Sequence, residues 1–137
     1  MSLESRTLSE VNVGDALPEL AIPLTTSLIV SGAIASRDFT PVHHDKAAAQ
    51  ASGVPDVFMN ILTTNGLVGR YVTDWAGPNA KIRNVQIKLG TPNTAGDTMT
   101  FNGSVTSKQD DEVTVELAGK NAWGDHVTAS VRVALPQ

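Results

Sequence analysis

Asp38 and His43 stand five positions apart, on either side of Pro41, within the segment 36–46. A carboxylate and an imidazole held by such a turn can share one water molecule and transfer a proton near neutral pH. The chain has three histidines and no cysteine, so thiol nucleophiles are excluded and acid–base chemistry has few carriers. This spacing alone is also typical of turns and helix caps. Asp38 and His43 are nevertheless the candidate catalytic residues.

The residues next to this pair favour helix capping over metal binding. His43, His44 and Asp45 are adjacent, so their side chains diverge, and no third ligand stands at helical spacing. We therefore expect no metal. Asp45 is better explained as the N-cap of the alanine-rich segment that follows it. His126 follows a turn, which predicts a solvated residue at a strand end and not a second base.

Length and charge narrow the class of protein. A chain of 137 residues suits a single domain over 1–137 with a core of its own. The net charge of −4, without a cluster of lysines and arginines, argues against a nucleic-acid partner. The apolar runs are too short to cross a bilayer, and residues 1–6 lack the apolar region of a signal peptide. We expect a cytoplasmic protein without a membrane partner.

The elements around the pair are predicted to be short and mainly helical. An extended entry that contains Pro18 and Pro23 predicts an edge strand or a loop. Residues 26–37 fit a short helix or a buried strand, and we favour the helix. Asp45 precedes a short alanine-rich helix that is expected to end at Gly53.

The most apolar helix is expected next, between a cap at Asp56 and the stop signal Gly77-Pro78. Its apolar residues recur at helical spacing, which core packing is sufficient to explain. They are Phe58, Ile61, Leu62, Val68 and Val72. We expect this helix to be the central one.

After the central helix the pattern changes to period two, which predicts strands. The acidic segment 110–112 and the glycine-containing segment 123–125 are expected hairpin turns, so the last strands form an antiparallel meander. Helices early and strands late predict an α+β domain whose sheet wraps around one buried helix. Apolar and polar residues alternate in segments 82–89, 99–105, 113–117 and 127–133.

The segment Asp38-Phe39-Thr40-Pro41-Val42-His43 resembles the Asp-x-Asn-Pro-x-His signature of the MaoC-like dehydratases. These hot-dog-fold enzymes include the (R)-specific enoyl-CoA hydratases. Similar residues run in the family's order along nearly the whole chain, at 13–15, 45, 56–75, 91–92, 96–98 and the closing valine-rich strand. One subgroup is resembled most closely, namely the small MaoC-like subunit of actinobacterial steroid side-chain enoyl-CoA hydratases. The residues that carry this closer resemblance are 37–39, 42–45, 60–63 and 70–78.

The resemblance implies reversible addition of water to the 2,3 double bond of a trans-2-enoyl-CoA, here a steroid side-chain acyl-CoA. It implies Asp38 and His43 as the acid–base residues, and it implies no metal or redox cofactor. The backbone amide of Asn60 is the expected oxyanion donor, at a position where relatives commonly carry the glycine of a His-Gly pair. Thr40 replaces the signature's asparagine, and Arg37 replaces a residue that is usually small or acidic. Both differences concern the local position of Asp38 more than the chemistry.

Substrate contacts are expected from two groups of residues. Phe58 and Ile61 are candidates for the wall of an acyl pocket. Arg70, Arg83 and Lys88 are candidates to bind the phosphates of CoA, although each alone also suits an ordinary surface charge.

The resemblance also implies assembly into a homodimer or a heteromer with a larger MaoC-like subunit, because hot-dog sheets rarely leave their edges uncovered. Two other functions remain open. One is a noncatalytic or acyl-CoA-binding hot-dog subunit of a larger complex, and the other is a hot-dog acyl-CoA thioesterase. The presence of both Asp38 and His43 counts against the first, and their spacing counts against the second.

Overall fold

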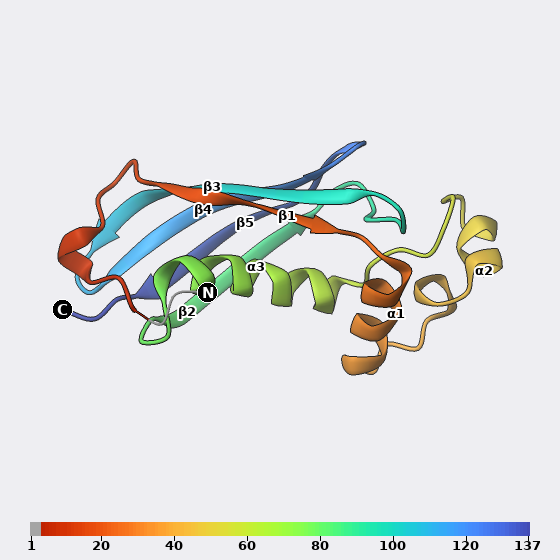
Figure 1. The fold of residues 1–137 in the computed structure, drawn as a ribbon, viewed down its shortest axis with the longest axis horizontal. Helices are drawn as coiled ribbons and strands as arrows, with labels where there is room; N and C mark the ends of the chain where they lie inside the picture. The colour runs from red at the N-terminus through yellow and green to blue at the C-terminus, as the bar shows by residue number, and fades with distance from the viewer. Residues whose placement is uncertain (1–3) are drawn as a thin grey trace.

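The computed structural model describes residues 4–137 and contains a five-stranded antiparallel sheet (Figure 1). The order across the sheet is β1-β3-β4-β5-β2. One long helix, α3 (Ile61–Ala76), lies along one face of the sheet. The strands are β1 (Ala16–Pro23), β2 (Lys81–Leu89), β3 (Thr98–Gln109), β4 (Glu112–Asn121) and β5 (Gly124–Ala134). The predicted α+β hot-dog fold, an antiparallel sheet around a central helix, is confirmed.

The connections agree with the predicted meander. β3, β4 and β5 are joined by two-residue turns at 110–111 and 122–123, and each pairs with its neighbour antiparallel. β1 occupies one edge of the sheet and contains Pro18 and Pro23, which cannot donate ladder hydrogen bonds. β2 occupies the other edge.

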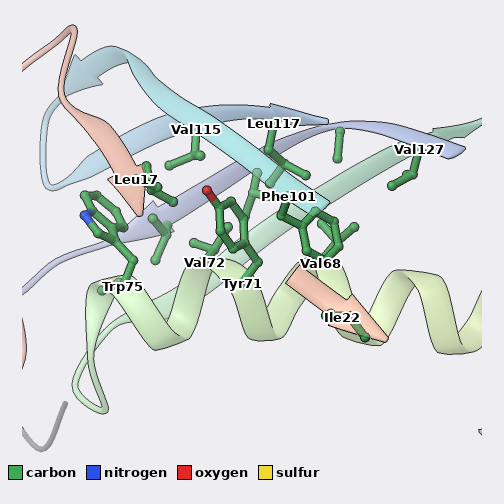
Figure 2. Close-up of a cluster of buried hydrophobic side chains, with 14 of the residues drawn as sticks. Leu17, Ile22, Val68, Tyr71, Val72, Trp75, Phe101, Val115, Leu117 and Val127 are labelled. Atoms are coloured by element: carbon green, nitrogen blue, oxygen red, sulfur yellow. The ribbon is translucent and has the colours of Figure 1, made fainter. Parts of the chain in front are cut away.

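The core lies between α3 and the sheet. The Tyr71 ring stacks on that of Phe101 with the centroids 5.0 Å apart, and its hydroxyl donates to the carbonyl of Pro18 at 2.9 Å. Figure 2 shows Val68, Val72 and Trp75 on the same side of the helix as Tyr71, facing the strands. Burying each such apolar side chain stabilises the fold by about 1.5–3 kcal/mol. The packing therefore fixes the orientation of α3, and with it the position of its first turn.

Two shorter helices, α1 (Thr26–Ala35) and α2 (Lys46–Ala51), gather at the N-terminal end of α3 (Figure 1). The helix favoured over 26–37 is thereby confirmed. Asp45 caps α2 as predicted, since its side chain accepts from the Ala47 amide at 3.0 Å. None of the helices within residues 4–137 is long and apolar enough to cross a membrane.

α1 lies directly against the first turn of α3. A Cβ atom at Gly32 would overlap the side chain of Thr63, so glycine at this position permits the close approach of the two helices. The end of α1 and the start of α3 therefore meet, although their facing positions 32 and 63 are 31 positions apart in the sequence.

The predicted start of the central helix at Asp56 is wrong. Residues 57–59 are extended and pair with 93–95, where the Met59 amide donates to the Asn93 carbonyl at 2.9 Å and Phe58 forms a bridge with Thr94. The helix begins at Ile61, with Asn60 as its N-cap. Pairing with residues 93–95 thus outweighs the local helical spacing of residues 57–59.

The predicted core on this helix is correct only beyond its first turn. Val68 and Val72 are fully buried, but the side chains of Ile61 and Leu62 are 51% and 53% exposed. Since the helix begins four residues later than predicted, Ile61 and Leu62 fall in its first turn, which lies beside α1. Phe58 lies in the extended segment before it and is half-buried.

Candidate active site

The end of α1 positions Asp38. Arg37 has a left-handed backbone, with φ of 58°, and its amide donates to Ile34 while the Asp38 amide donates to Ala33. This hydrogen-bond pattern is a Schellman motif, in which the left-handed residue is usually glycine. Arg37, which departs from the family's usual residue, therefore ends the helix and turns the chain so that Asp38 follows immediately.

A one-turn 3₁₀ helix, η2 (Pro41–His43), positions His43. Pro41 starts this turn, where its fixed φ is favourable and its missing N–H costs nothing. His43 is 8% exposed, and its ring meets that of Phe58 edge to face with the centroids 5.1 Å apart. The ring is therefore held by packing on one side and by a turn on the other.

Hydrogen bonding defines the tautomer of His43. Its Nδ1 lies 2.6 Å from the carbonyl oxygen of Phe58. A carbonyl only accepts, so Nδ1 carries the proton and donates it. Nε2 is then the nitrogen available for chemistry, and it lies 3.3 Å from Oδ2 of Asp38. The predicted pair is brought together by the fold.

The two oxygens of the Asp38 carboxylate have different surroundings. Oδ1 accepts from the hydroxyl of Thr40 at 2.7 Å and from its backbone amide at 3.2 Å. Oδ2 accepts from Nδ2 of Asn60 at 3.2 Å and faces His43. Thr40 thus supplies two donors in the place of the signature's asparagine.

These donors hold the carboxylate in its charged form. The hydrogen bonds from Thr40 lower the pKa of Asp38, with smaller lowering contributions from Asn60 and from the charge of His43, while partial burial opposes them. Asp38 is ionised at neutral pH. When His43 is neutral, Nε2 and Oδ2 are two acceptors facing one another, an arrangement that suits a water molecule donating one hydrogen to each.

Asn60 is the N-cap of α3 and is 1% exposed. Its backbone amide lies at the positive end of the helix dipole, where anionic oxygens are stabilised. The predicted oxyanion role of this amide fits that location and stays a prediction.

The predicted substrate-binding residues fall into two groups. Phe58 and Ile61 lie on either side of Met59 and Asn60, next to the pair, and the Phe58 carbonyl binds His43 directly. Arg70 lies in α3 nearly three turns beyond Asn60, and Arg83 and Lys88 lie in β2. All five assignments stay predictions as substrate contacts.

The three cations have other surroundings. Arg70 pairs with Asp74 one turn on, with Nε 3.2 Å from Oδ2. Arg83 binds the carboxylate of Asp111 through both Nη atoms at 2.8 Å, near the β3–β4 turn at the end of the sheet opposite α1 and α2 (Figure 1). Lys88 is exposed in β2. Any phosphate contact by Arg83 would compete with a bidentate carboxylate partner.

The prediction of a solvated His126 is wrong. The residue is 3% exposed; its Nδ1 donates to the Thr91 carbonyl at 2.7 Å and its Nε2 accepts from the Thr64 hydroxyl at 2.8 Å. Burial lowers the pKa of His126, so it is neutral at pH 7. Strand alternation would place His126 on the face opposite Val127, but the pairing of β4 with β5 shifts register between Gly119 and Lys120, opposite His126. The ring is covered by the first turn of α3, where Thr64 contacts it. His126 is a structural residue, consistent with leaving it out of the site.

Sequence reasoning indicated Ile61 but missed the other exposed apolar residues near the pair. This apolar surface consists of Ile34, Phe39, Ile61 and Leu62, which are all between 51% and 63% exposed and belong to α1, the following loop and the first turn of α3. Phe39 lies between Asp38 and Thr40 within the signature segment. This position is the sequence signal that could have indicated an apolar surface here.

Comparison with known proteins identifies the family of the chain. The family described as MaoC like domain matches residues 11–134. The chain belongs to the MaoC-like family. Its sequence is also 52% identical, over 123 residues, to the 3-oxo-4,17-pregnadiene-20-carboxyl-CoA hydratase beta subunit of Mycobacterium tuberculosis, covering 90% of this chain and 95% of that protein.

Two solved structures show the same fold. One chain of the ChsH1-ChsH2 complex from Mycobacterium tuberculosis superposes with a TM-score of 0.89 at 52% identity, over 90% of this chain and 98% of that one. The R-hydratase PhaJ1 from Pseudomonas aeruginosa superposes with the same TM-score at 19% identity, over 97% of this chain and 87% of that one. The second likeness supports the fold alone.

Proposed function

We propose that this MaoC-like chain hydrates a trans-2-enoyl-CoA, with Asp38 and His43 as its acid–base residues. The observation that carries the proposal is the approach of His43 Nε2 to Asp38 Oδ2 at 3.3 Å, with Nδ1 fixed as a donor to Phe58. The two acceptors hold one water. As its oxygen attacks C3, one of them takes a proton, and a proton is returned to C2.

The charge that develops on the thioester oxygen requires a donor placed in advance. The amide of Asn60 at the start of α3 is assigned this role, because the helix dipole points its positive end there. The reaction moves only protons and water, so these residues suffice without a metal or redox cofactor.

We further propose a steroid side-chain acyl-CoA as substrate and a larger MaoC-like chain as partner. The support is the hydratase beta subunit that is 52% identical to this chain, and the matching chain of a two-protein complex. The exposed apolar surface at Ile34, Phe39, Ile61 and Leu62 is suited to a bulky apolar group or a second chain beside the pair.

The test is the loss of enoyl thioester absorbance with a steroid enoyl-CoA and with crotonyl-CoA, with and without the suspected partner chain. Wild-type protein is compared with Asp38→Asn and His43→Gln. His44→Gln and Asp110→Asn are matched controls, because both residues are exposed and stand outside the proposed chemistry. We expect hydration in wild type and controls, and its loss in the two site variants.

Other outcomes point to the alternatives. Release of free CoA thiol that depends on Asp38 would indicate a thioesterase. Full activity of the complex with Asp38→Asn and with His43→Gln would make this chain a binding subunit and overturn the proposal.

A further inference from the structure

The side chain of Asn60 makes four hydrogen bonds while only 1% exposed. Its Oδ1 accepts from the backbone amide of Thr63 at 3.2 Å and from the Thr63 hydroxyl at 2.5 Å. Its Nδ2 donates to Ser36 Oγ at 2.8 Å and to Asp38 Oδ2 at 3.2 Å. A backbone N–H only donates, so Oδ1 must face Thr63 and the amide nitrogen must face Asp38.

We propose that the Asn60 side chain is a positioning residue of the hydration site, joining the start of α3 to the end of α1 and holding the Asp38 oxygen that faces His43. This inference rests on the proposed function, and it goes beyond the oxyanion role of the Asn60 backbone amide. The side chain and the amide of one residue then serve two different parts of the site.

The contacts at either end of Asn60 are themselves anchored. Ser36 donates its hydroxyl hydrogen to the carbonyl of Gly32 at 2.7 Å, so its oxygen is oriented to accept from Asn60. Thr63 lies against Gly32 in the contact between α1 and α3. The side chain of Asn60 is therefore held by residues of both helices.

Asp38 needs such a contact because its own loop supplies donors to only one carboxylate oxygen. Thr40 binds Oδ1 and lies two residues away on the same loop. The terminal torsion of an aspartate is broad, so a carboxylate held at one oxygen can still rotate. Asn60 holds the second oxygen from a different element, which fixes the carboxylate plane relative to His43. Misplacement of a reacting group by about 1 Å can cost about 100-fold in rate.

The glycine that relatives commonly carry at position 60 would supply the backbone amide but no side chain. A glycine would leave the second oxygen of Asp38 without this donor. The departure from the family pattern at Asn60 is thus an additional contact on the catalytic carboxylate, complementary to the departure at Thr40.

The charged surroundings of Asp38 are few. His43 is the titratable group in contact with it, and Arg37 and His44 lie nearby in sequence and are exposed. Residues 26–35 of α1 include no titratable side chain. On α3, the titratable residues begin at Arg70, ten positions after Asn60 and so nearly three turns away.

The test compares Asn60→Ser and Asn60→Asp with wild type. Both replacements retain a good N-cap for Thr63, so helix formation is preserved. Serine is too short to reach Asp38, and aspartate sets a second carboxylate against it. Asn102→Ser, at an exposed position in β3, is the matched control. Two quantities are measured: kcat and KM for the enoyl-CoA, and the titration of the Asp38 carboxyl carbon by ¹³C NMR.

For Asn60→Ser we expect kcat to fall about 10- to 100-fold, with KM changing less than about threefold. The pKa of Asp38 should rise, because a donor to its charged form is lost. For Asn60→Asp we expect a larger fall in kcat. The acid limb of the pH profile of kcat should also shift to higher pH, because two facing carboxylates share a proton. The control should match wild type in both measurements.

An unchanged kcat together with an unchanged Asp38 titration in folded Asn60→Ser would overturn the inference. If wild-type protein shows no hydration, the proposed function fails. The NMR titration then still decides whether Asn60 holds the Asp38 carboxylate, so the two failures are distinguishable.

Discussion

His43 and His126 both donate from Nδ1 to a backbone carbonyl, at 2.6 Å from Phe58 and 2.7 Å from Thr91. They differ in what faces Nε2. For His126 it is the hydroxyl of Thr64, which donates a hydrogen to the lone pair. For His43 it is the carboxylate of Asp38, which has no hydrogen to give. Both nitrogens of His126 therefore have hydrogen-bond partners of opposite kind within the protein, whereas Nε2 of His43 faces a carboxylate.

Their surroundings extend this contrast. Thr64 and Val127 beside His126 are buried, and the contacts of His126 connect β5 and the loop after β2 to α3. The surroundings of His43 include exposed apolar residues such as Phe39 and Ile61. Two rings with the same tautomer thus differ in their surroundings, because only His43 faces a carboxylate next to an exposed surface.

The largest expected effect separates the two histidines by activity. His43→Gln should lower kcat/KM for the enoyl-CoA by about 10²- to 10⁴-fold, because a general acid–base group is lost. His126→Gln should lower it by less than about tenfold, since its effect on the site passes through the packing of α3. Steady-state kinetics of both variants measures the difference, and equal losses would contradict the contrast.

The second effect separates them by stability. His126→Ala should lower the free energy of unfolding by roughly 2–4 kcal/mol, because it leaves a cavity and removes the acceptor of a buried hydroxyl. His43→Ala should cost less, because the site is partly open to water. Urea unfolding of each variant gives the values. A greater loss for His43→Ala would reverse this comparison.

The third effect concerns pH. Burial lowers the pKa of His126 below the value of 6.5 for an unperturbed histidine, so the unfolded chain binds a proton more readily than the folded one. Its contribution to stability is complete above about pH 6.5 and is lost as the pH falls through the lower folded-state pKa. Urea unfolding at pH 7.5 and 5.5 should show a smaller decrease for His126→Gln than for wild type. An identical decrease would assign this pH dependence to other groups.

The smallest effect tests the loop that aims Asp38. Arg37→Gly should change the free energy of unfolding by no more than about 1 kcal/mol, and toward higher stability, because glycine adopts the left-handed conformation freely. Arg37→Val should be destabilising by at least about 1 kcal/mol, since a β-branched residue is strained there. Thermal unfolding compares the two. If valine were tolerated as well as glycine, the Schellman motif would not determine the end of α1.

Much of the fold follows from local patterns. Alternating residues in β4 and β5, the prolines of β1 and the cap at Asp45 each depend on neighbours within a few positions, and the structure agrees with them. The start of α3 depends instead on pairing of 57–59 with 93–95, more than 30 residues away. Local helical spacing cannot report a partner at that distance, which is why the boundary was predicted at Asp56.

The site divides in the same way. The types and spacing of Asp38, Pro41 and His43 are local, so the sequence predicts the pair. The side-chain contact of Asn60 with Asp38, and the burial of His126 under α3, join residues more than 20 and more than 60 positions apart.

The sequence by itself determined which groups are available for chemistry, because residue type sets which atoms can donate, accept or titrate. It also determined the hot-dog fold, through periodicity and an ordered set of family residues. The tertiary structure alone decided what each ring nitrogen of His43 and His126 faces, and which oxygen of Asp38 is held by Asn60. These depend on distances between elements, which packing sets and which spacing along the chain does not encode.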